Sequence, residues 1–385
     1  MTNRDTPALR GYHEATKHSV ASVRQSRHGL DWDIMPRPFK VYPDLEPLLL
    51  PRDFDTGPRP ALGALTDATP AHTAGPLLDC RALARLLFFT AGIVRTKTYP
   101  RGEMHFRAAA CTGALYHLDL YVVCGPLPDL PAGVYHFGPH DFALRRLRAG
   151  DHRSALVAAA GGAAAIADAP VTLVLSSTFW RNSWKYQARA YRHCFWDGGT
   201  LLANLLAVAT AVGLSAEVVL GYTDADVDAL VGIDGTREAS IALVPLGGGL
   251  PGLASSPPVE PLALATLPES SEQIDYPAIP AAHHASALRS GSEVCAWREL
   301  AAPVVVPLGA RPPETLVPLH ALPTHTVPEP IETVILRRGS ARRFSHEPIS
   351  AAELATVLGC ATARVPFDLG RNGRALAELY VIVNA

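Results

Sequence analysis

The stretch Phe179–Thr200, FWRNSWKYQARAYRHCFWDGGT, decides how the rest of the chain is interpreted. It contains five basic residues, several aromatic residues and one acid, Asp197. It follows an apolar run, Val171–Leu175, and precedes an almost wholly apolar segment, Leu201–Val212. Charged side chains between two buried elements are costly unless they bind an anion or take part in catalysis. A basic helix face exposed to solvent is the alternative interpretation.

Composition restricts the classes of protein to which the chain can belong. Its 385 residues are enough for one large domain or two. The net charge of −2 gives no indication of nucleic-acid binding, and no apolar run reaches the roughly 18–20 residues that a membrane helix needs. The first residues contain no apolar segment typical of a secretory signal. The six cysteines are scattered without metal-site spacing, so we expect no metal and a cytoplasmic location.

Four β-branched or apolar runs predict strands in the region around this stretch. Leu118–Cys124 is rich enough in aromatic and β-branched residues to form a strand. Val171–Ser177 has no polar face, which predicts a central strand covered on both sides. Ala216–Tyr222 and Ser240–Leu246 are predicted as further strands.

Capping residues and apolar spacing predict the helices. Asp79 is a plausible N-cap for a helix whose buried face carries Leu83, Leu86 and Leu87. A short helix is predicted at Asp224–Val231. Asp197 is predicted to cap a helix from Gly198 to Val212, followed by Gly213 at the C′ position. That helix is apolar all round, so we expect it to be buried all round.

The pattern K-Y-x-x-R-x-Y-R over Lys185–Arg192, followed by W-D-G-G, resembles the SagB-type dehydrogenases. These are flavin enzymes of the nitroreductase superfamily that oxidise azoline rings in ribosomally made peptide natural products. The resemblance implies that Lys185 and Tyr186 are the catalytic pair. The motifs Y-H-x-x-T-K-H from Tyr12 and L-D-W-x-x-x-P-x-P-F-K-x-Y-P from Leu30 are similar to the amino-terminal region of the same family.

A second motif of this family, R-x-x-P-S-A-G-A-L-Y-P, resembles the segment that begins at Arg107. The resemblance implies that the backbone of Cys111, Thr112 and Gly113 lies against the ring of FMN, with Arg107 also binding the cofactor. Cys111 and Thr112 replace the usual Ser and Ala. Glycine allows a backbone to approach a flat ligand closely. A tight turn before a strand is the alternative interpretation of the same residues.

A second copy of the module is predicted to begin near Ile331. Leu354 and its neighbours repeat the spacing of the helix around Leu83, and Leu379–Ile382 repeats Leu120–Val123. The segment opens with Arg338, Ser340 and Arg342, which resemble the phosphate-binding R-x-S-x-R element of nitroreductase modules. Arginine guanidinium groups bind phosphate in a bidentate manner, which is consistent with this role. A basic helix start is the alternative.

The resemblance and the repeat together predict an α+β, nitroreductase-like fold with a central, mostly antiparallel sheet flanked by helices, tandem duplicated with the second copy incomplete. The predicted divisions are an arm and loop (1–76), a first module (77–250), a proline-rich linker (251–330) and the start of a second module (331–385). Either the chain comes from a longer protein or another chain completes the second module. A site shared between the two copies predicts a pseudo-dimer or a homodimer.

The predicted function is an FMN-dependent dehydrogenase, an azoline oxidase that converts a thiazoline or oxazoline to the azole. The resemblance implies a peptide or small azoline substrate and a complex with a cyclodehydratase as partners, with no nucleic acid and no membrane. Two alternatives remain open. One is an NAD(P)H-dependent, nitroreductase-like flavin reductase, which does not need the Lys-Tyr pair. The other is a non-catalytic module that binds a peptide or docks in a biosynthetic complex.

Overall fold

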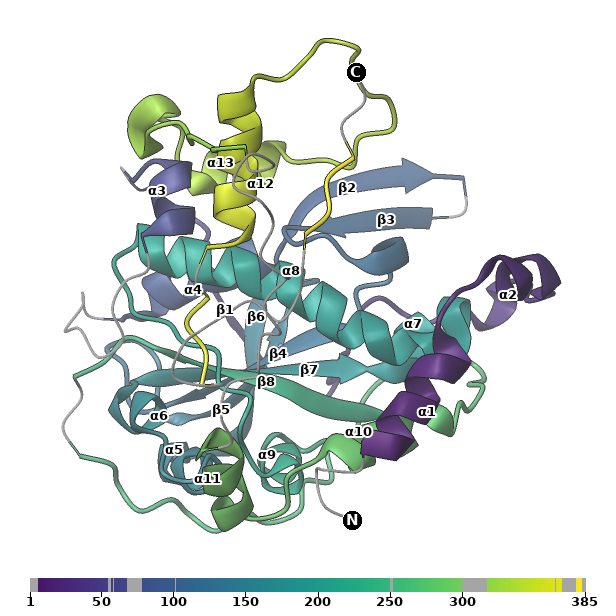
Figure 1. Ribbon diagram of the computed structural model, residues 1–385. Coiled ribbons are helices and arrows are strands. Elements are labelled where there is room, and N and C mark those ends of the chain that lie inside the picture. Colours follow the sequence, from purple (N-terminus) through teal and green to yellow (C-terminus); the bar gives the residue numbers. More distant parts are fainter. Residues whose placement is uncertain are drawn as a thin grey trace.

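A six-stranded antiparallel sheet forms the middle of the protein (Figure 1). The computed structural model describes residues 6–54, 57, 59–67, 78–100, 102–249, 252–299, 317–363, 365–368 and 379–382. Every pairing in this sheet is antiparallel, which confirms the predicted α+β class with a mostly antiparallel sheet. The strands lie in the order β1 (Pro47–Leu49), β6 (Ala143–Ala149), β5 (Gly133–Gly138), β4 (Leu118–Cys124), β7 (Val171–Thr178) and β8 (Glu238–Leu246).

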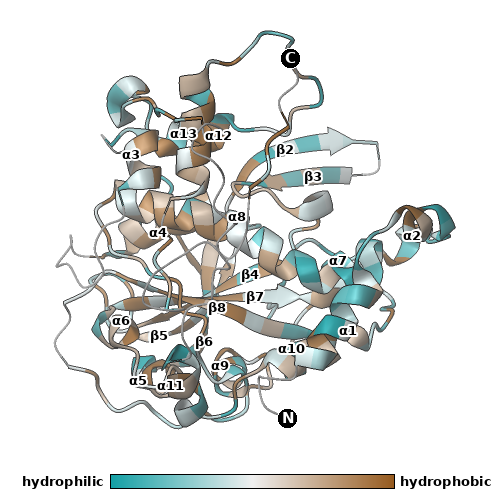
Figure 2. Cartoon of the chain, in the orientation of Figure 1, coloured by the Kyte–Doolittle hydropathy of each residue, from teal (hydrophilic) through white to brown (hydrophobic). Residues whose placement is uncertain are grey.

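The two inner strands confirm the prediction of a core covered on both sides. All residues of β4 and β7 are buried, and the two strands pair along their whole length, with Leu120 opposite Leu175. Apolar colouring in Figure 2 follows these strands and the helix faces that cover them. Because successive side chains point to opposite faces of a sheet, an apolar run without alternation requires cover on both.

Helices cover the two faces of the sheet and create two separate cores. One core contains side chains from α4 (Cys80–Ala91) and α8 (Ala190–Ala211). The other contains side chains from α5 (Arg153–Ala159) and α9 (Asp224–Val231). Asp79 accepts a hydrogen bond from the Ala82 N–H, so the predicted N-cap of α4 is confirmed. The remaining helices are α1 (Thr6–Thr16), α2 (Val20–Gln25), α3 (Ala61–Thr66), α6 (Ala164–Asp168), α7 (Phe179–Tyr186), α10 (Ala278–Ser286), α11 (Gly291–Glu299), α12 (Ile331–Arg337) and α13 (Ala351–Ala361), with short 3-10 turns at 32–34, 112–114, 187–189 and 324–326.

Two predictions about the elements near the basic stretch are wrong. The long helix begins at Ala190, not at Gly198, so Asp197 lies inside α8 and caps nothing. The helical segment is interrupted before α8 at Gln187, where a φ of 52° ends α7. The predicted strand at Ala216–Tyr222 is reduced to isolated bridges, such as that between Val219 and Leu243 at the edge of β8 and that between Val218 and Phe367.

A two-stranded hairpin, β2 (Ile93–Tyr99) and β3 (Gly102–Arg107), projects from the sheet (Figure 1). It carries the chain from α4 to the loop that begins at Ala108. Most of its side chains are exposed except where β3 ends at the buried Arg107. The hairpin therefore positions the following loop beside the first residue of β4.

The segments predicted as arm and linker pack against the first module. Tyr12 of α1 contacts the ring of Tyr191 on α8, and Ile279 of α10 is buried. Proline content indicates irregular backbone, but it does not prevent such a segment from packing. Residues 300–316 of the predicted linker lie outside the described residues.

The start of the predicted second copy lies beside α3 and α4. Glu332 of α12 is fully buried and forms an ion pair with Arg85 of α4. The helix predicted around Leu354 is present as α13, capped by Ser350, whereas residues 379–382 form no strand and are exposed. The tandem duplication and the bounds of the four predicted divisions of the chain remain predictions.

One helical segment, Phe179–Ala211, is long and apolar enough to cross a membrane by length and composition. Half of its most apolar window is buried inside the protein. Core helices of globular domains have the same property, and α8 packs against the sheet as such a helix.

Arg181 lies in a buried ion-pair network at the end of the sheet. Its side chain is fully buried; Nη1 donates to Asp119 Oδ2 at 2.8 Å, while Nε and Nη2 donate to the two oxygens of Glu269 at 2.7 and 2.9 Å. Burial alone would raise the pKa of Asp119, but Arg181 outweighs it and holds that pKa well below its usual value. The solvated-face interpretation is therefore wrong for this base.

Replacement of Arg181 is expected to be strongly destabilising. Arg181→Ala leaves two carboxylates without their cation, so the free energy of unfolding should fall by about 3–5 kcal/mol in urea titrations at pH 7. The matched control Arg95→Ala, at an exposed position of β2, should change it by less than about 0.5 kcal/mol. Because the Asp119 pKa is depressed on folding, the difference between wild type and Arg181→Ala should shrink as the pH falls below about 4. Equal effects of the two substitutions would contradict this account.

Candidate functional site

The loop between β3 and β4 has an unusual backbone. Gly113, Ala114 and Tyr116 have φ values of 66°, 55° and 47°, in the left-handed region that favours glycine. Only Gly113 adopts this conformation without steric cost, and each of the other two costs about 1–3 kcal/mol. Contacts from outside the loop must therefore hold it in place.

Asp197 of α8 provides those contacts. Its carboxylate accepts hydrogen bonds from the Thr112 N–H at 3.0 Å and the Thr112 hydroxyl at 2.8 Å. The Cys111 thiol donates to Oδ2 at 3.3 Å, and His117 Nε2 lies 2.9 Å from the same oxygen. One buried carboxylate thus joins both ends of the loop to the long helix.

These contacts determine the protonation states of Asp197 and Cys111. Burial alone would raise the pKa of Asp197, but the hydrogen bonds from His117 and Thr112 outweigh it and hold the pKa below its usual value. Burial and the Asp197 charge raise the pKa of Cys111 well above that of a free thiol. Cys111 is therefore a neutral thiol that donates to a carboxylate, and it is not an activated nucleophile.

Lys185 and Tyr186, at the end of α7, lie against this loop. A Cβ atom added to Gly113 would be 2.9 Å from Tyr186 Oη and 3.4 Å from Lys185 Cδ. Both side chains are half-buried, and Lys185 Nζ lies 5.6 Å from the centre of the Tyr186 ring. Burial, with Asp197 and Cys111 nearby, raises the pKa of Tyr186, so its phenol stays protonated near neutral pH.

His193 supports Tyr186 from α8. Its ring meets the Tyr186 ring edge-on, with centroids 4.5 Å apart. His193 Nδ1 lies 2.6 Å from the amide oxygen of Asn182, and burial lowers the His193 pKa to about 4. A neutral imidazole therefore fixes the orientation of the phenol.

Arg107, predicted to bind the cofactor, is occupied by the protein itself. Its guanidinium donates to the carbonyl oxygens of Leu118 and Pro38 at 3.0 and 2.7 Å and stacks on the rings of Phe39 and Tyr116. Burial lowers its pKa to about 10. In this arrangement Arg107 stabilises the loop through its contacts with the protein.

The predicted phosphate-binding residues approach the loop from the far end of the sequence. Arg338 Nη2 donates to the carbonyl oxygen of Ala108 at 3.3 Å. Ser340 and Arg342 are exposed and have no hydrogen-bond partner among the described residues. The structure brings Arg338 to the loop, and leaves Ser340 and Arg342 facing solvent beside it.

Spacing rules on the sequence missed two members of this group. His117 is adjacent to a predicted strand, and Asp197 was assigned a capping role, so neither was predicted to lie in the site. Together with Cys111 they form a cluster of metal-ligand types whose ligand atoms lie within 4.8 Å of one another. Only the fold brings these three together, because they are separated by up to 86 residues.

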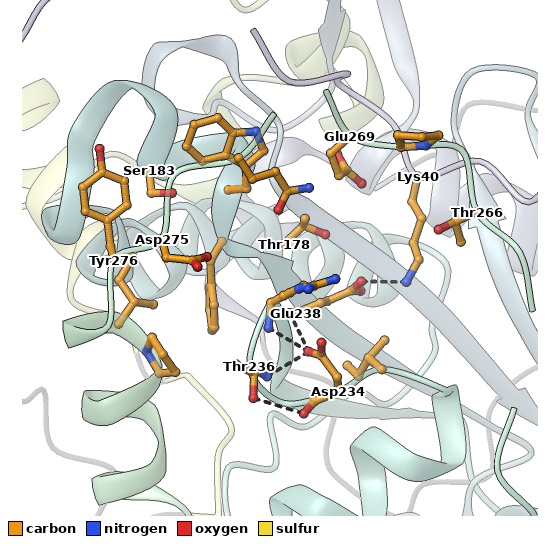
Figure 3. A pocket seen from close by; sticks show the side chains of 18 of the residues that line it. Lys40, Thr178, Ser183, Asp234, Thr236, Glu238, Thr266, Glu269, Asp275 and Tyr276 are labelled. Atoms are coloured by element: carbon orange, nitrogen blue, oxygen red, sulfur yellow. Dashed lines mark hydrogen bonds and ion pairs between the residues drawn. The ribbon is translucent and has the colours of Figure 1, made fainter. Parts of the chain in front are cut away.

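Two cavities lie near these residues. A void of about 10 Å³, enough for one water molecule, lies beside Cys111 and Asp197. A cleft of about 740 Å³ lies against another face of α7, between Trp180, the start of β8 and the segment 262–280 (Figure 3). Its buried charges are paired within the protein, since Lys40 Nζ lies 2.6 Å from Glu238 Oε2. The loop and the Lys-Tyr pair do not line this cleft.

Loss of the Asp197 charge is expected to loosen the loop. Asp197→Asn keeps the shape but offers one acceptor oxygen to several donors, which should lower the free energy of unfolding by about 1–3 kcal/mol. Hydrogen exchange of the Thr112 amide, measured by NMR, should accelerate more than that of the β4 amides. Asp44→Asn, at an exposed site, serves as control. Unchanged Thr112 protection in Asp197→Asn would show that the carboxylate does not hold the loop.

Comparison with known sequences finds similarity in the central part of the chain. Residues 106–248 match the family model described as the nitroreductase family. A Methanocaldococcus jannaschii protein, named as a nitroreductase (MJ1384), is 27% identical over 170 residues, which make up 44% of this chain and 81% of that protein.

Solved structures show the same fold over most of the chain. A protein of Anabaena variabilis ATCC 29413 assigned as a nitroreductase matches with a TM-score of 0.66 at 23% identity, over 91% of this chain and 67% of that chain. The Escherichia coli microcin synthetase McbBCD complex matches with a TM-score of 0.40 at 20% identity, over 64% of this chain and 95% of that chain, which is too distant to bear on function. The predicted nitroreductase-like fold is confirmed. The residues that match the nitroreductase family model, 106–248, carry the loop, the Lys-Tyr pair and Asp197.

Proposed function

We propose that this protein is an FMN-dependent dehydrogenase that oxidises a thiazoline or oxazoline ring, in a peptide or peptide-like substrate, to the azole. The match to the nitroreductase family model favours an oxidoreductase. One observation carries the finer assignment: Lys185 and Tyr186, the pair of the SagB-type motif, lie against Gly113 of the loop that resembles the flavin-binding loop.

The residues around the loop fit FMN on its open side. The void beside Cys111 has a volume of about 10 Å³ and is too small for a flavin ring, which must lie outside it. Gly113 allows close approach of a flat ring next to Tyr186. Arg338, with Ser340 and Arg342 exposed nearby, would hold the phosphate.

The oxidation removes a proton and a hydride from neighbouring carbons of the azoline ring. Bound FMN would supply the hydride acceptor. Lys185 is the base that accepts the proton in this reaction, and it lies beside the loop at the end of α7. The protonated Tyr186 donates a hydrogen bond to the substrate ring and orients it.

Two other functions remain as alternatives, each with a specific observation. The relatives named as nitroreductases favour an NAD(P)H-dependent flavin reductase. A non-catalytic module that binds a peptide is favoured by the Thr112 N–H, which donates to Asp197 and is therefore not available to a flavin.

FMN binding is expected to depend on the arginines of the second copy. Arg338→Ala and Arg342→Ala should each weaken FMN affinity by about tenfold or more, because each removes a charged hydrogen bond of about 1.5–3 kcal/mol. Titration of the flavin-free protein with FMN, followed by flavin fluorescence and the visible spectrum, measures this. Arg343→Ala, which replaces the neighbouring arginine that is not among the predicted phosphate-binding residues, should keep the wild-type affinity. A wild-type protein that takes up no FMN would favour the non-catalytic module.

Lys185 is expected to be needed for azoline oxidation but not for FMN binding. Lys185→Ala should slow the anaerobic bleaching of bound flavin by a thiazoline-containing peptide by about 100-fold or more, since a positioned base contributes 10²–10⁴. Its FMN affinity should stay within about threefold of wild type. Lys97→Ala in the exposed hairpin is the matched control. Wild-type bleaching rates in Lys185→Ala, or bleaching only by NAD(P)H, would favour the flavin reductase.

A further inference from the structure

We propose that Cys111, His117 and Asp197 form a binding site for a divalent transition-metal ion of the zinc class. The three residues come from the loop after β3, the residue before β4 and the middle of α8. Their ligand atoms lie within 4.8 Å of one another, and thiolate, imidazole and carboxylate are the ligands that zinc prefers. This proposal does not depend on flavin binding or on the proposed reaction.

The spacing of the ligand atoms suits a tetrahedral ion. Asp197 Oδ2 lies 3.3 Å from Cys111 Sγ and 2.9 Å from His117 Nε2. Zinc bonds of about 2.3 Å to sulfur and about 2.0 Å to nitrogen and oxygen imply ligand separations of roughly 3.3–3.5 Å. The ion therefore needs shifts of a few tenths of an ångström at these two contacts, and the third pair of ligand atoms, Cys111 Sγ and His117 Nε2, lies within 4.8 Å.

Binding replaces hydrogen-bond protons with the ion. The Cys111 thiol loses its proton to solvent and binds as the thiolate. His117 binds through Nε2, which leaves Nδ1 to carry the imidazole proton. Asp197, whose pKa is held below its usual value, binds as the carboxylate.

Neighbouring groups hold each ligand in the required orientation. His117 Nδ1 lies 2.8 Å from Ser177 Oγ, which can accept the Nδ1 proton when Nε2 binds the ion. The other carboxylate oxygen of Asp197 accepts from the Thr112 hydroxyl at 2.8 Å. Such supporting hydrogen bonds are typical of protein metal sites and weigh against a chance cluster.

Three protein ligands leave one position for a small fourth ligand. A water-sized void is lined by two of the three ligands, Cys111 and Asp197. Since the ion would join the loop to α8 more firmly than hydrogen bonds do, occupancy should make the 111–116 segment more rigid.

Cobalt(II) is the probe of choice, because its thiolate complexes absorb in the near ultraviolet and visible range. We expect one Co²⁺ per full-length, flavin-free chain under reducing conditions, with a thiolate charge-transfer band and tetrahedral visible bands. Zn²⁺ should displace it, as expected from the order of metal affinities. Cys111→Ser should abolish the charge-transfer band, and Ser177→Ala should weaken binding by about tenfold or more. Cys295→Ser and Cys360→Ser, which remove thiols outside the cluster, should bind as wild type does.

X-ray absorption of the wild-type zinc complex provides a readout that needs no variant to fold. The proposal requires one sulfur at about 2.3 Å together with nitrogen and oxygen ligands at about 2.0 Å. No sulfur, two or more sulfurs, a charge-transfer band that persists in Cys111→Ser, or no Co²⁺ binding at millimolar concentration would each overturn it.

Discussion

The carboxylate of Asp197 is the contact on which the site geometry depends. It lies inside a helix whose buried residues are mostly apolar, and it accepts hydrogen bonds from Cys111 and Thr112 of the strained loop and contacts His117. A buried carboxylate with so many donors is stabilised as the anion, whereas the same group without them would be costly. The left-handed conformations at Ala114 and Tyr116 persist because this anion holds both ends of the loop.

The short helix α7 separates two different electrostatic environments. On its inner side Arg181 forms ion pairs with Asp119 and Glu269, and it holds the pKa of Asp119 well below its usual value. At its end the groups near the loop are mainly neutral: the Cys111 thiol, the Tyr186 phenol and the His193 imidazole. Ion pairs stabilise the fold there, whereas neutral donors beside one fixed carboxylate are suited to proton chemistry or ligand binding.

Segments distant in the sequence complete this arrangement. Arg338 reaches the loop from 230 residues away because the ion pair between Arg85 and Glu332 fixes α12 beside α4. The amino-terminal arm also reaches the loop, since Ile34 of the arm and Leu115 of the loop lie in one buried cluster with Trp180 and Trp184. The loop therefore lies where the arm, the central module and the beginning of the predicted second copy meet.

The sequence by itself determined those elements whose signals are local. Apolar runs identified β4 and β7, and the side chain of Asp79 identified the start of α4, because a strand's burial and a helix cap depend on residues close in the chain. It also indicated Lys185 and Tyr186 through their motif. Tertiary structure alone decided the role of Asp197, the seating of Gly113 against Tyr186, and the meeting of Cys111 with His117. Such contacts join residues that only the packed sheet and helices bring together, and no spacing rule along one chain encodes the distance between two elements.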